Sequence, residues 1–183
     1  MIVSLTLICG VCGFLLAGVH AMTKVRIEEQ ILKYVQMPAV KSVLATSDND
    51  LLGDRRKISV DGSEMTVFTG KKGGTVWALA YETIVDGAQG KLGVIVGVDV
   101  STDKLTGIGI TTCAETPGIG DRIKEETFKN LFKERSITDN LGLKKDNGVI
   151  DAITGATYSS QATCDAVVKG VSLYKKIKAE VVQ

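Results

Sequence analysis

The chain begins with a continuous apolar stretch. Between Met1 and Thr23 no side chain carries a formal charge apart from a protonated His20, and apolar residues dominate this part of the sequence. A helix needs about 20 such residues to cross the hydrocarbon core of a bilayer, where it satisfies its own backbone hydrogen bonds. Residues 1–23 are therefore predicted to form one transmembrane helix that anchors the chain in a membrane.

A cleaved signal peptide is the alternative for this stretch, because Val19 and Ala21 fit the small-residue rule for cleavage. The basic residues that open a signal peptide are missing, which favours the anchor. Lys24 and Arg26 follow the span and nothing basic precedes it. Taken alone, this charge pattern favours a cytoplasmic position for the rest of the chain.

Further along, the pattern changes to a period of two, which is typical of β-strands. It is clearest from Val94 to Val100, where every second residue is valine. A hairpin turn is predicted at Lys71-Lys72-Gly73-Gly74. Turn sequences separate the valine-rich segment from three similar segments, at residues 64–69, 75–83 and 105–112. These four sequential strands predict an antiparallel meander.

A helix is predicted near the C-terminus, because the apolar residues of 159–181 fall on one stripe at helical spacing. A shorter helix is predicted at 121–132 and a short strand at 149–153. The predicted fold class is therefore α+β, with helices packed on an antiparallel sheet. The predicted parts are a transmembrane anchor (1–23), a helical connector with the start of the soluble domain (24–63), and a sheet-and-helix domain (64–183).

Composition narrows the possible classes of function. Lys+Arg number 22 and Asp+Glu 21, and the absence of a basic patch argues against nucleic-acid binding. The one histidine argues against hydrolytic triads and classical zinc sites, so no metal site is predicted. The four cysteines form no disulfide framework. For Cys9 and Cys12, packing against a neighbouring helix is favoured over half of an iron–sulfur or metal site.

A hydroxyl-rich stretch precedes the predicted C-terminal helix. Free N–H groups and the dipole at a helix N-terminus attract phosphate, and Gly155 and Ala156 let it approach closely. The Thr157 hydroxyl is then placed to form a phosphoester, although an N-cap after a glycine turn also fits these residues. The candidate site residues are Asp151, Thr154, Gly155, Ala156, Thr157 and Ser160.

A second motif, residues 111–120, links the last strand of the meander to the next helix. Pro117 and Gly118 suit the central positions of a type II turn, and a simple connector is the ordinary interpretation. The functional interpretation is a backbone loop along a flat ring, to which Glu115 and Thr116 offer polar contacts. Neither motif is specific alone. The order and spacing of the two motifs, in a chain that starts with one apolar span, are specific.

These features resemble the G subunit family of the Rnf complex, the membrane ferredoxin:NAD oxidoreductase. The resemblance covers nearly the whole chain. It rests on the motifs Gly13-Phe14-Leu15-Leu16-Ala17, Glu115-Thr116-Pro117-Gly118-Ile119-Gly120 and Asp151-Ala152-Ile153-Thr154-Gly155-Ala156-Thr157. The chain is also similar to the C subunit of the sodium-pumping NADH:quinone reductase, but its length without a large insertion favours Rnf.

The resemblance implies that residues 64–183 form an FMN-binding domain, with FMN attached to Thr157 through a phosphoester. It implies a separate flavin transferase that uses FAD as donor. It further implies a redox relay, in which the FMN passes electrons between the ferredoxin and NAD sides of the complex. The expected setting is a bacterial or archaeal plasma membrane, crossed once, with the flavin domain outside the cytoplasm beside other Rnf subunits.

Two other classes of function compete with this interpretation. The first is a membrane-tethered assembly subunit without cofactor, in which the span and the long helix serve docking alone. The second is a sensor that binds a phosphate or nucleotide non-covalently at the same helix start. Intact mass separates the first from a flavoprotein, and release of the ligand on denaturation identifies the second.

Overall fold

The computed structural model describes residues 2–60 and 62–181 of the chain. The predicted segments 1–23, 24–63 and 64–183 also include Met1, Asp61, Val182 and Gln183, which lie outside the described residues. The chain divides into two compact units, Met1–Val35 and Gln36–Gln183.

The first unit consists almost entirely of the helix α1, Ile2–Ile31, and all residues of this helix are exposed. The helical stretch that contains it is the one in the described part of the chain that is long and apolar enough to cross a membrane. A signal sequence near the N-terminus meets the same requirement. The helix expected at the N-terminus is therefore present, and it extends beyond Thr23 to Ile31.

The helical stretch continues beyond α1 and through Pro38. A π-helical segment, η1 (Leu32–Gln36), follows α1 and leads into α2, Met37–Val43. Pro38 lies in the first turn of α2, directly after the π-helical segment. The residue is therefore accommodated without ending the helical stretch.

The second unit is built on a five-stranded sheet in the order β1-β2-β3-β4-β5. Every neighbouring pair is antiparallel, so the predicted meander is confirmed, with one additional strand at its edge. The turn after β2 is formed by Gly73 and Gly74, as predicted. The strands are β1 (Arg56–Val60), β2 (Ser63–Lys72), β3 (Thr75–Asp86), β4 (Lys91–Asp99) and β5 (Lys104–Cys113).

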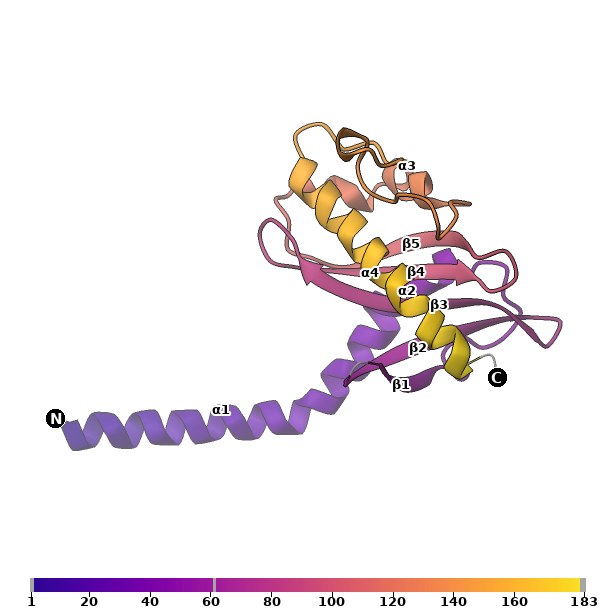
Figure 1. Cartoon of the computed structure of the whole chain (residues 1–183). Helices are drawn as coiled ribbons and strands as arrows, with labels where there is room; N and C mark the ends of the chain where they lie inside the picture. The colour runs from indigo at the N-terminus through magenta and orange to yellow at the C-terminus, as the bar shows by residue number, and fades with distance from the viewer. Residues whose placement is uncertain (1, 61, 182–183) are drawn as a thin grey trace. The chain divides into compact units, whose positions relative to one another are not determined.

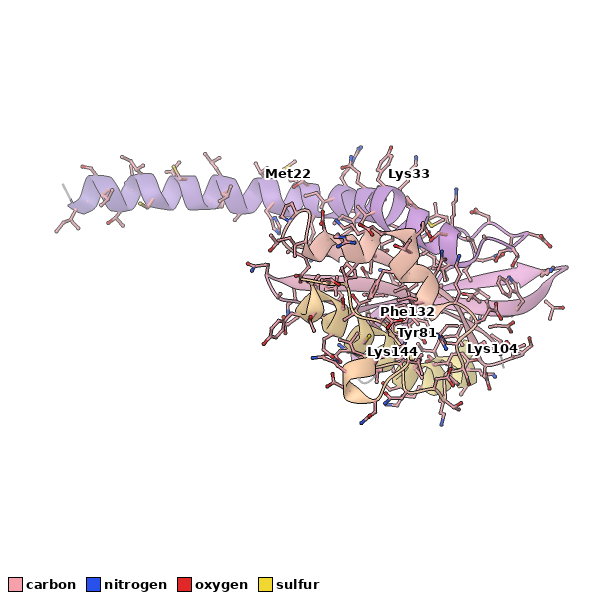
Figure 2. The ribbon with its side chains drawn as sticks, turned by 90° about the horizontal axis from the view of Figure 1, so that it is seen from above. Met22, Lys33, Tyr81, Lys104, Phe132 and Lys144 are labelled. Carbon is pink, nitrogen blue, oxygen red and sulfur yellow. The ribbon has the colours of Figure 1, made fainter. Side chains whose placement is uncertain are left out.

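Helices cover both faces of this sheet. The long helix α4, Thr157–Val181, packs on β3 and β4, and α2 packs on β4 and β5. Figure 1 shows α4 crossing one face of the sheet, and Figure 2 shows the sheet between α2 and α4. The two faces explain the alternation in β4, because the valines are core residues packed with α4 whereas Gly97 makes room for Val43 of α2.

Buried hydrogen bonds fix α4 on the sheet at two levels. The Tyr81 hydroxyl donates to the carbonyl of Gly170 (2.9 Å), and the Thr83 hydroxyl donates to the carbonyl of Ala166 (2.9 Å). Because buried polar groups must be paired, these contacts specify one position of the helix on the sheet. The start of α4 is thereby held at one end of β3 and β4.

The C-terminal half of α4 is held by a polar cluster at the β4–β5 turn. Tyr174 and Lys178 both donate to the Asp103 carboxylate, each at 2.8 Å. The bonds from Lys178 and then Tyr174 lower the pKa of Asp103, while burial and the bond to Asp103 raise the pKa of Tyr174 to about 12. Asp103 is therefore ionised and Tyr174 neutral at physiological pH.

Three expected elements differ from the structure. The single helix predicted at 121–132 is wrong, because Glu125 adopts an extended conformation that divides the segment. Short pieces replace it: the 3-10 segment η2 (Gly120–Lys124), α3 (Glu126–Lys129) and the 3-10 segment η3 (Asn130–Phe132). Another 3-10 turn, η4 (Lys144–Asp146), follows in the next loop.

The strand predicted at 149–153 is also wrong. Ile150 is fully buried, but it forms a single parallel bridge with Leu143. The apolar residues of this segment serve the core rather than a sheet. The last helix is confirmed, but it begins at Thr157 instead of Ser159. This earlier start changes the surroundings of the candidate site.

Candidate functional site

A tight turn leads directly into the N-terminus of α4. The N–H of Ala156 donates to the carbonyl of Ile153 (2.9 Å), and Gly155 has a φ of 82°. A left-handed residue at this position is what a type II turn requires, and glycine adopts it without strain. The turn places Thr157, exposed, as the first residue of the helix.

Ser160 holds this turn together. Its buried hydroxyl donates to the carbonyl of Ala156 (2.9 Å) and accepts the N–H of Ile153 (3.1 Å). The N–H of Ser160 also donates to the carbonyl of Ala156 (2.9 Å), which is the first backbone bond of the helix. The hydroxyl of Ser160 is therefore already bonded within the protein, and the residue contributes to the site by holding the turn in place.

The first turn of α4 leaves its N–H groups available. Within the described residues, no hydrogen bond is formed by the N–H groups of Thr157, Tyr158 and Ser159. The first N–H groups of any helix lack partners inside the helix, and together with the helix dipole they favour an anion. No acidic side chain lies in this first turn. The start of this 25-residue helix thus has the donors and the charge that a phosphate needs.

The Glu115–Gly120 loop forms a second turn of the same kind. The N–H groups of Ile119 (3.2 Å) and Gly120 (2.9 Å) donate to the carbonyl of Thr116. Gly118 has a φ of 75°, and the turn predicted at Pro117 and Gly118 is present. The loop therefore reverses sharply after β5 and returns towards the start of α4.

Both turns border one hollow of about 340 Å³. Two segments far apart in the sequence thus meet at one site, as the functional interpretation of each motif requires. A third segment, the turn between β3 and β4, joins them through Ala88. The lining residues are Ala88, Glu115, Thr116, Ile119, Gly120, Gly155, Ala156, Thr157, Tyr158 and Ser159.

The other predicted site residues lie around the hollow rather than in its lining. Asp151 is exposed and pairs with Lys144, with 2.7 Å between Oδ2 and Nζ. Thr154 is exposed in the turn before Ala156, and Gly118 occupies the tip of the other loop. These residues shape or flank the site, while Thr157 presents its hydroxyl-bearing side chain at the surface.

Glu115 is buried, and both of its carboxylate oxygens are already bonded within the protein. Oε1 accepts the N–H of Ala88 (2.8 Å), and Oε2 accepts the hydroxyl of Ser159 (2.7 Å). The side chain is 7% exposed. The expected contact between Glu115 and a flat ring remains a prediction, and the observed role is to join the β3–β4 turn, the loop and α4.

The sequence missed the β3–β4 turn as part of the site. Its only signal was Gly87, whose Cα approaches Glu115 so closely that an added Cβ would lie 2.1 Å from Oε1. Ile119 and Tyr158 are exposed by 50% and 82%. They place apolar surface beside the polar start of α4.

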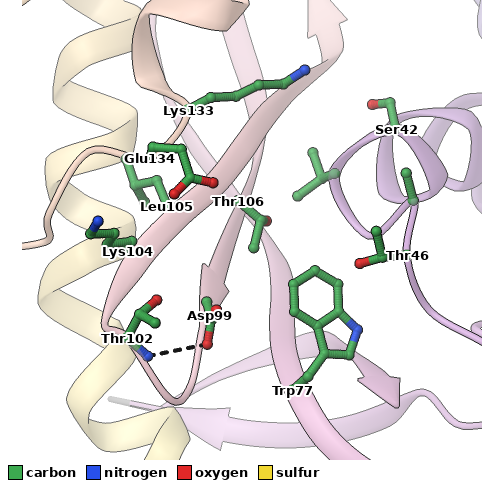
Figure 3. A pocket seen from close by; sticks show the side chains of 12 residues that line it. Ser42, Thr46, Trp77, Asp99, Thr102, Lys104, Leu105, Thr106, Lys133 and Glu134 are labelled. Carbon is green, nitrogen blue, oxygen red and sulfur yellow. Dashed lines mark hydrogen bonds between the residues drawn. The ribbon is translucent and has the colours of Figure 1, made fainter. Parts of the chain in front are cut away.

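A second hollow, of about 290 Å³, lies near α2 and contains none of the motif residues (Figure 3). Asp99 in its wall accepts the N–H of Thr102 (3.2 Å), and Ser42 donates to the carbonyl of Ala39 (2.8 Å). These polar groups already serve the local turns, so the hollow at the start of α4 is the better candidate. Among the described cysteines, Cys164 is buried, and burial raises its pKa to about 12, which keeps the thiol protonated.

The residues around the first hollow fit an FMN. The exposed Thr157 side chain and three available N–H groups suit a phosphate, and Ile119 and Tyr158 offer apolar contact to a ring. Residues 87–172, which contain all three segments, match the family model of the FMN-binding domain.

Solved structures show the same fold. The C subunit of the Na(+)-translocating NADH-quinone reductase from Parabacteroides distasonis ATCC 8503 is similar to this chain with a TM-score of 0.55 and 22% identity. The similarity covers 70% of this chain and 67% of that chain. The fold and the matched family model together define an FMN-binding domain that follows an N-terminal apolar helix in the sequence.

Curated relatives show to which family of FMN-binding proteins the chain belongs. The chain is 31% identical to the G subunit of the ion-translocating oxidoreductase complex of Photorhabdus laumondii, over 94% of this chain and 87% of that protein. It is 29% identical to the G subunit of the corresponding complex of Methanosarcina acetivorans, over 91% and 89% of the two proteins. The chain belongs to this family, the G subunits of ion-translocating oxidoreductase complexes, which confirms the resemblance inferred from the motifs.

Proposed function

We propose that this protein carries FMN as a phosphoester on Thr157 Oγ1. The observation that supports the proposal most is the position of Thr157, exposed as the first residue of α4 and lining the hollow that both motifs border. The N–H groups of the first helical turn stabilise the phosphate, and Gly155 leaves the approach open because nothing lies within 4 Å of the place of a Cβ. Ile119 and Tyr158 provide apolar contact to the ring.

Attachment requires a group transfer that this chain does not perform alone. In the proposed reaction, Thr157 Oγ1 attacks the phosphorus of the FMN half of FAD and loses its proton. A new P–O bond forms, the pyrophosphate bond breaks, and AMP leaves. A separate flavin transferase binds the FAD and catalyses this step, while Thr157 is a modification site with no part in turnover.

The bound FMN supplies one-electron and two-electron redox chemistry, and the protein supplies position and electrostatics. We propose that the protein works beside other membrane subunits of an Rnf-type ferredoxin:NAD oxidoreductase and relays electrons within it. The names of the relatives favour this complex over the sodium-translocating quinone reductase. A shallow site at the surface suits the role, because successive redox partners can approach the flavin closely.

The test is intact mass spectrometry of the full-length protein, co-expressed with its flavin transferase and extracted in detergent. We expect a mass increase equal to FMN minus water, carried by the peptide that contains Thr157, and flavin fluorescence that persists on a denaturing gel. Flavin that is lost on denaturation would support the non-covalent sensor instead. A protein without flavin would support the cofactor-free assembly subunit.

We further propose that α1 crosses the membrane once and that the flavin domain lies outside the cytoplasm. The family resemblance supports this side, whereas Lys24 and Arg26 favour the opposite one. We expect added protease to digest the domain in spheroplasts, where the outer surface is accessible, and to spare it in inverted vesicles. Digestion in inverted vesicles alone would reverse the proposed orientation.

A further inference from the structure

Glu115 stands out because a buried carboxylate is bonded only to neutral donors. Its Oε1 accepts the backbone N–H of Ala88 (2.8 Å) and its Oε2 accepts the Ser159 hydroxyl (2.7 Å). An isolated buried charge is costly, and two hydrogen bonds compensate it only in part. The Glu115 carboxylate lies in the lining of the hollow beside the start of α4, and among the described residues no cationic side chain pairs with it.

The backbone at two glycines closely approaches the Glu115 side chain. A Cβ added at Gly87 would lie 2.1 Å from Oε1. One added at Gly120 would lie 2.8 Å from the Cβ of Glu115 and 2.7 Å from the Ser159 Oγ. The absence of side chains at Gly87 and Gly120 therefore leaves room for the carboxylate between the β3–β4 turn and α4.

Ser159 connects this charge to the attachment point. It is buried, lies two residues after Thr157 in the first turn of α4, and its carbonyl accepts the Thr163 hydroxyl (2.8 Å). The hydrogen bond from Ser159 both holds the helix start against the loop and withdraws charge from Oε2. Glu115 and Thr157 line the same hollow, so the carboxylate lies on the wall of the site where the FMN is proposed to be attached.

We infer that Glu115 is a positioning residue that, through Ser159, fixes the start of α4 and lowers the reduction potential of the FMN on Thr157. The inference rests on the proposed function. Electrons that enter a flavin without an equal number of protons make it more negative, and a nearby carboxylate opposes that change. The hydrogen bonds from Ala88 and Ser159 set how strongly it does so.

Two variants with opposite expected effects test this inference. Glu115→Gln keeps the size of the side chain and its hydrogen bonds, since the Ser159 hydroxyl can also accept, but removes the charge. We expect the midpoint potential of the covalent FMN to rise. Ser159→Ala keeps the charge and removes one donor, so the midpoint potential is expected to fall. A purely structural role would loosen the site in both variants and shift both potentials in the same direction.

The measurement is a spectroscopic redox titration of the full-length, flavin-loaded protein in detergent, with dithionite as reductant. Glu134→Gln is the matched control, because it removes an exposed carboxylate from the wall of the other hollow and should leave the potential unchanged. An unchanged potential in Glu115→Gln, or shifts of the same sign in both variants, overturns the inference.

The inference is also overturned if Glu115→Gln loses FMN attachment while Ser159→Ala keeps it. Glu115 would then be needed for the attachment reaction itself. If Glu115→Gln fails to fold, Ser159→Ala decides alone, and a potential that is unchanged or higher rejects the inference. Failure of the proposed function is distinct from all of these outcomes, since wild-type protein would then carry no covalent flavin before any titration begins.

Discussion

Replacing Thr157 with alanine is expected to abolish covalent FMN, lowering the modified fraction of the protein to background. The substitution removes the one atom, Oγ1, to which the phosphate is proposed to bond. Its structural cost is small, because Thr157 is exposed at the first position of α4 and alanine is a good helix former. We therefore expect a folded protein whose intact mass equals that of the unmodified chain.

Two matched variants separate attachment from folding. Thr157→Ser retains a hydroxyl at the same place and is expected to carry FMN, with slower attachment because the side chain is less restricted in rotation. Thr154→Ala removes a nearby exposed hydroxyl and should leave the covalent bond intact. Covalent flavin in Thr157→Ala, or its loss from Thr154→Ala with retention in Thr157→Ala, would place the bond on another residue.

The sheet was predictable because hydrophobic burial dictates its pattern directly. From Val94 to Val98 alternate residues face the core beneath α4, and the period of two follows from that geometry. The edge strand Arg56–Val60 was not predicted, because an edge strand contributes few core residues and only Ile58 and Val60 are buried. A strand of this kind is defined mainly by its pairing with β2, which the sequence does not display.

Local patterns failed where tertiary contacts overrode them. The apolar residues Ile123, Phe128 and Phe132 have a helical spacing, yet Glu125 adopts an extended conformation that divides the segment. Ile123 enters the core before this break, whereas Phe128 and Phe132 enter it after the break and pack on each other. Burial decided the structure here, and helical periodicity predicted which residues are buried without predicting the element that carries them.

For the site, too, the sequence indicated which residues take part but not where each side chain lies. The motifs indicated Thr157, Gly155 and the loop from Glu115, and the structure brings them to one hollow. The sequence did not indicate that Glu115 points inward to Ala88, because that contact joins segments separated by the whole of β4 and β5. Polar residues near a candidate cofactor site can thus serve as its internal support, which changes what their substitution is expected to do.

The loop that precedes the attachment turn is expected to be the most sensitive to a single added methyl group. In Gly148→Ala, the new Cβ would lie 1.9 Å from the carbonyl oxygen of Gly142 and 2.1 Å from its carbon. Those atoms belong to the backbone, so the loop itself must move. The movement breaks the bonds from Gly148 N–H to Leu143 (2.9 Å) and from Ile150 N–H to Gly142 (3.1 Å), beside the fully buried Leu143 and Ile150.

We expect Gly148→Ala to lower the free energy of unfolding by about 3 kcal/mol, the upper end of the usual cost of overpacking. Gly142→Ala is the matched control in the same loop. Its Cβ would meet only the Asn140 Oδ1, at 3.2 Å, and a side chain can give way. That variant should therefore stay within about 1 kcal/mol of wild type.

Urea unfolding of the full-length protein in detergent, followed by the fluorescence of Trp77, measures both changes. Trp77 is the only tryptophan, is half-buried in β3, and its indole N–H donates to the Ser47 hydroxyl (3.0 Å), so its emission reports the folded sheet. Equal stability of the two variants would contradict the close approach of Gly142 and Gly148. A selective loss of stability in Gly148→Ala would show that the close approach of these two backbone segments stabilises the folded domain.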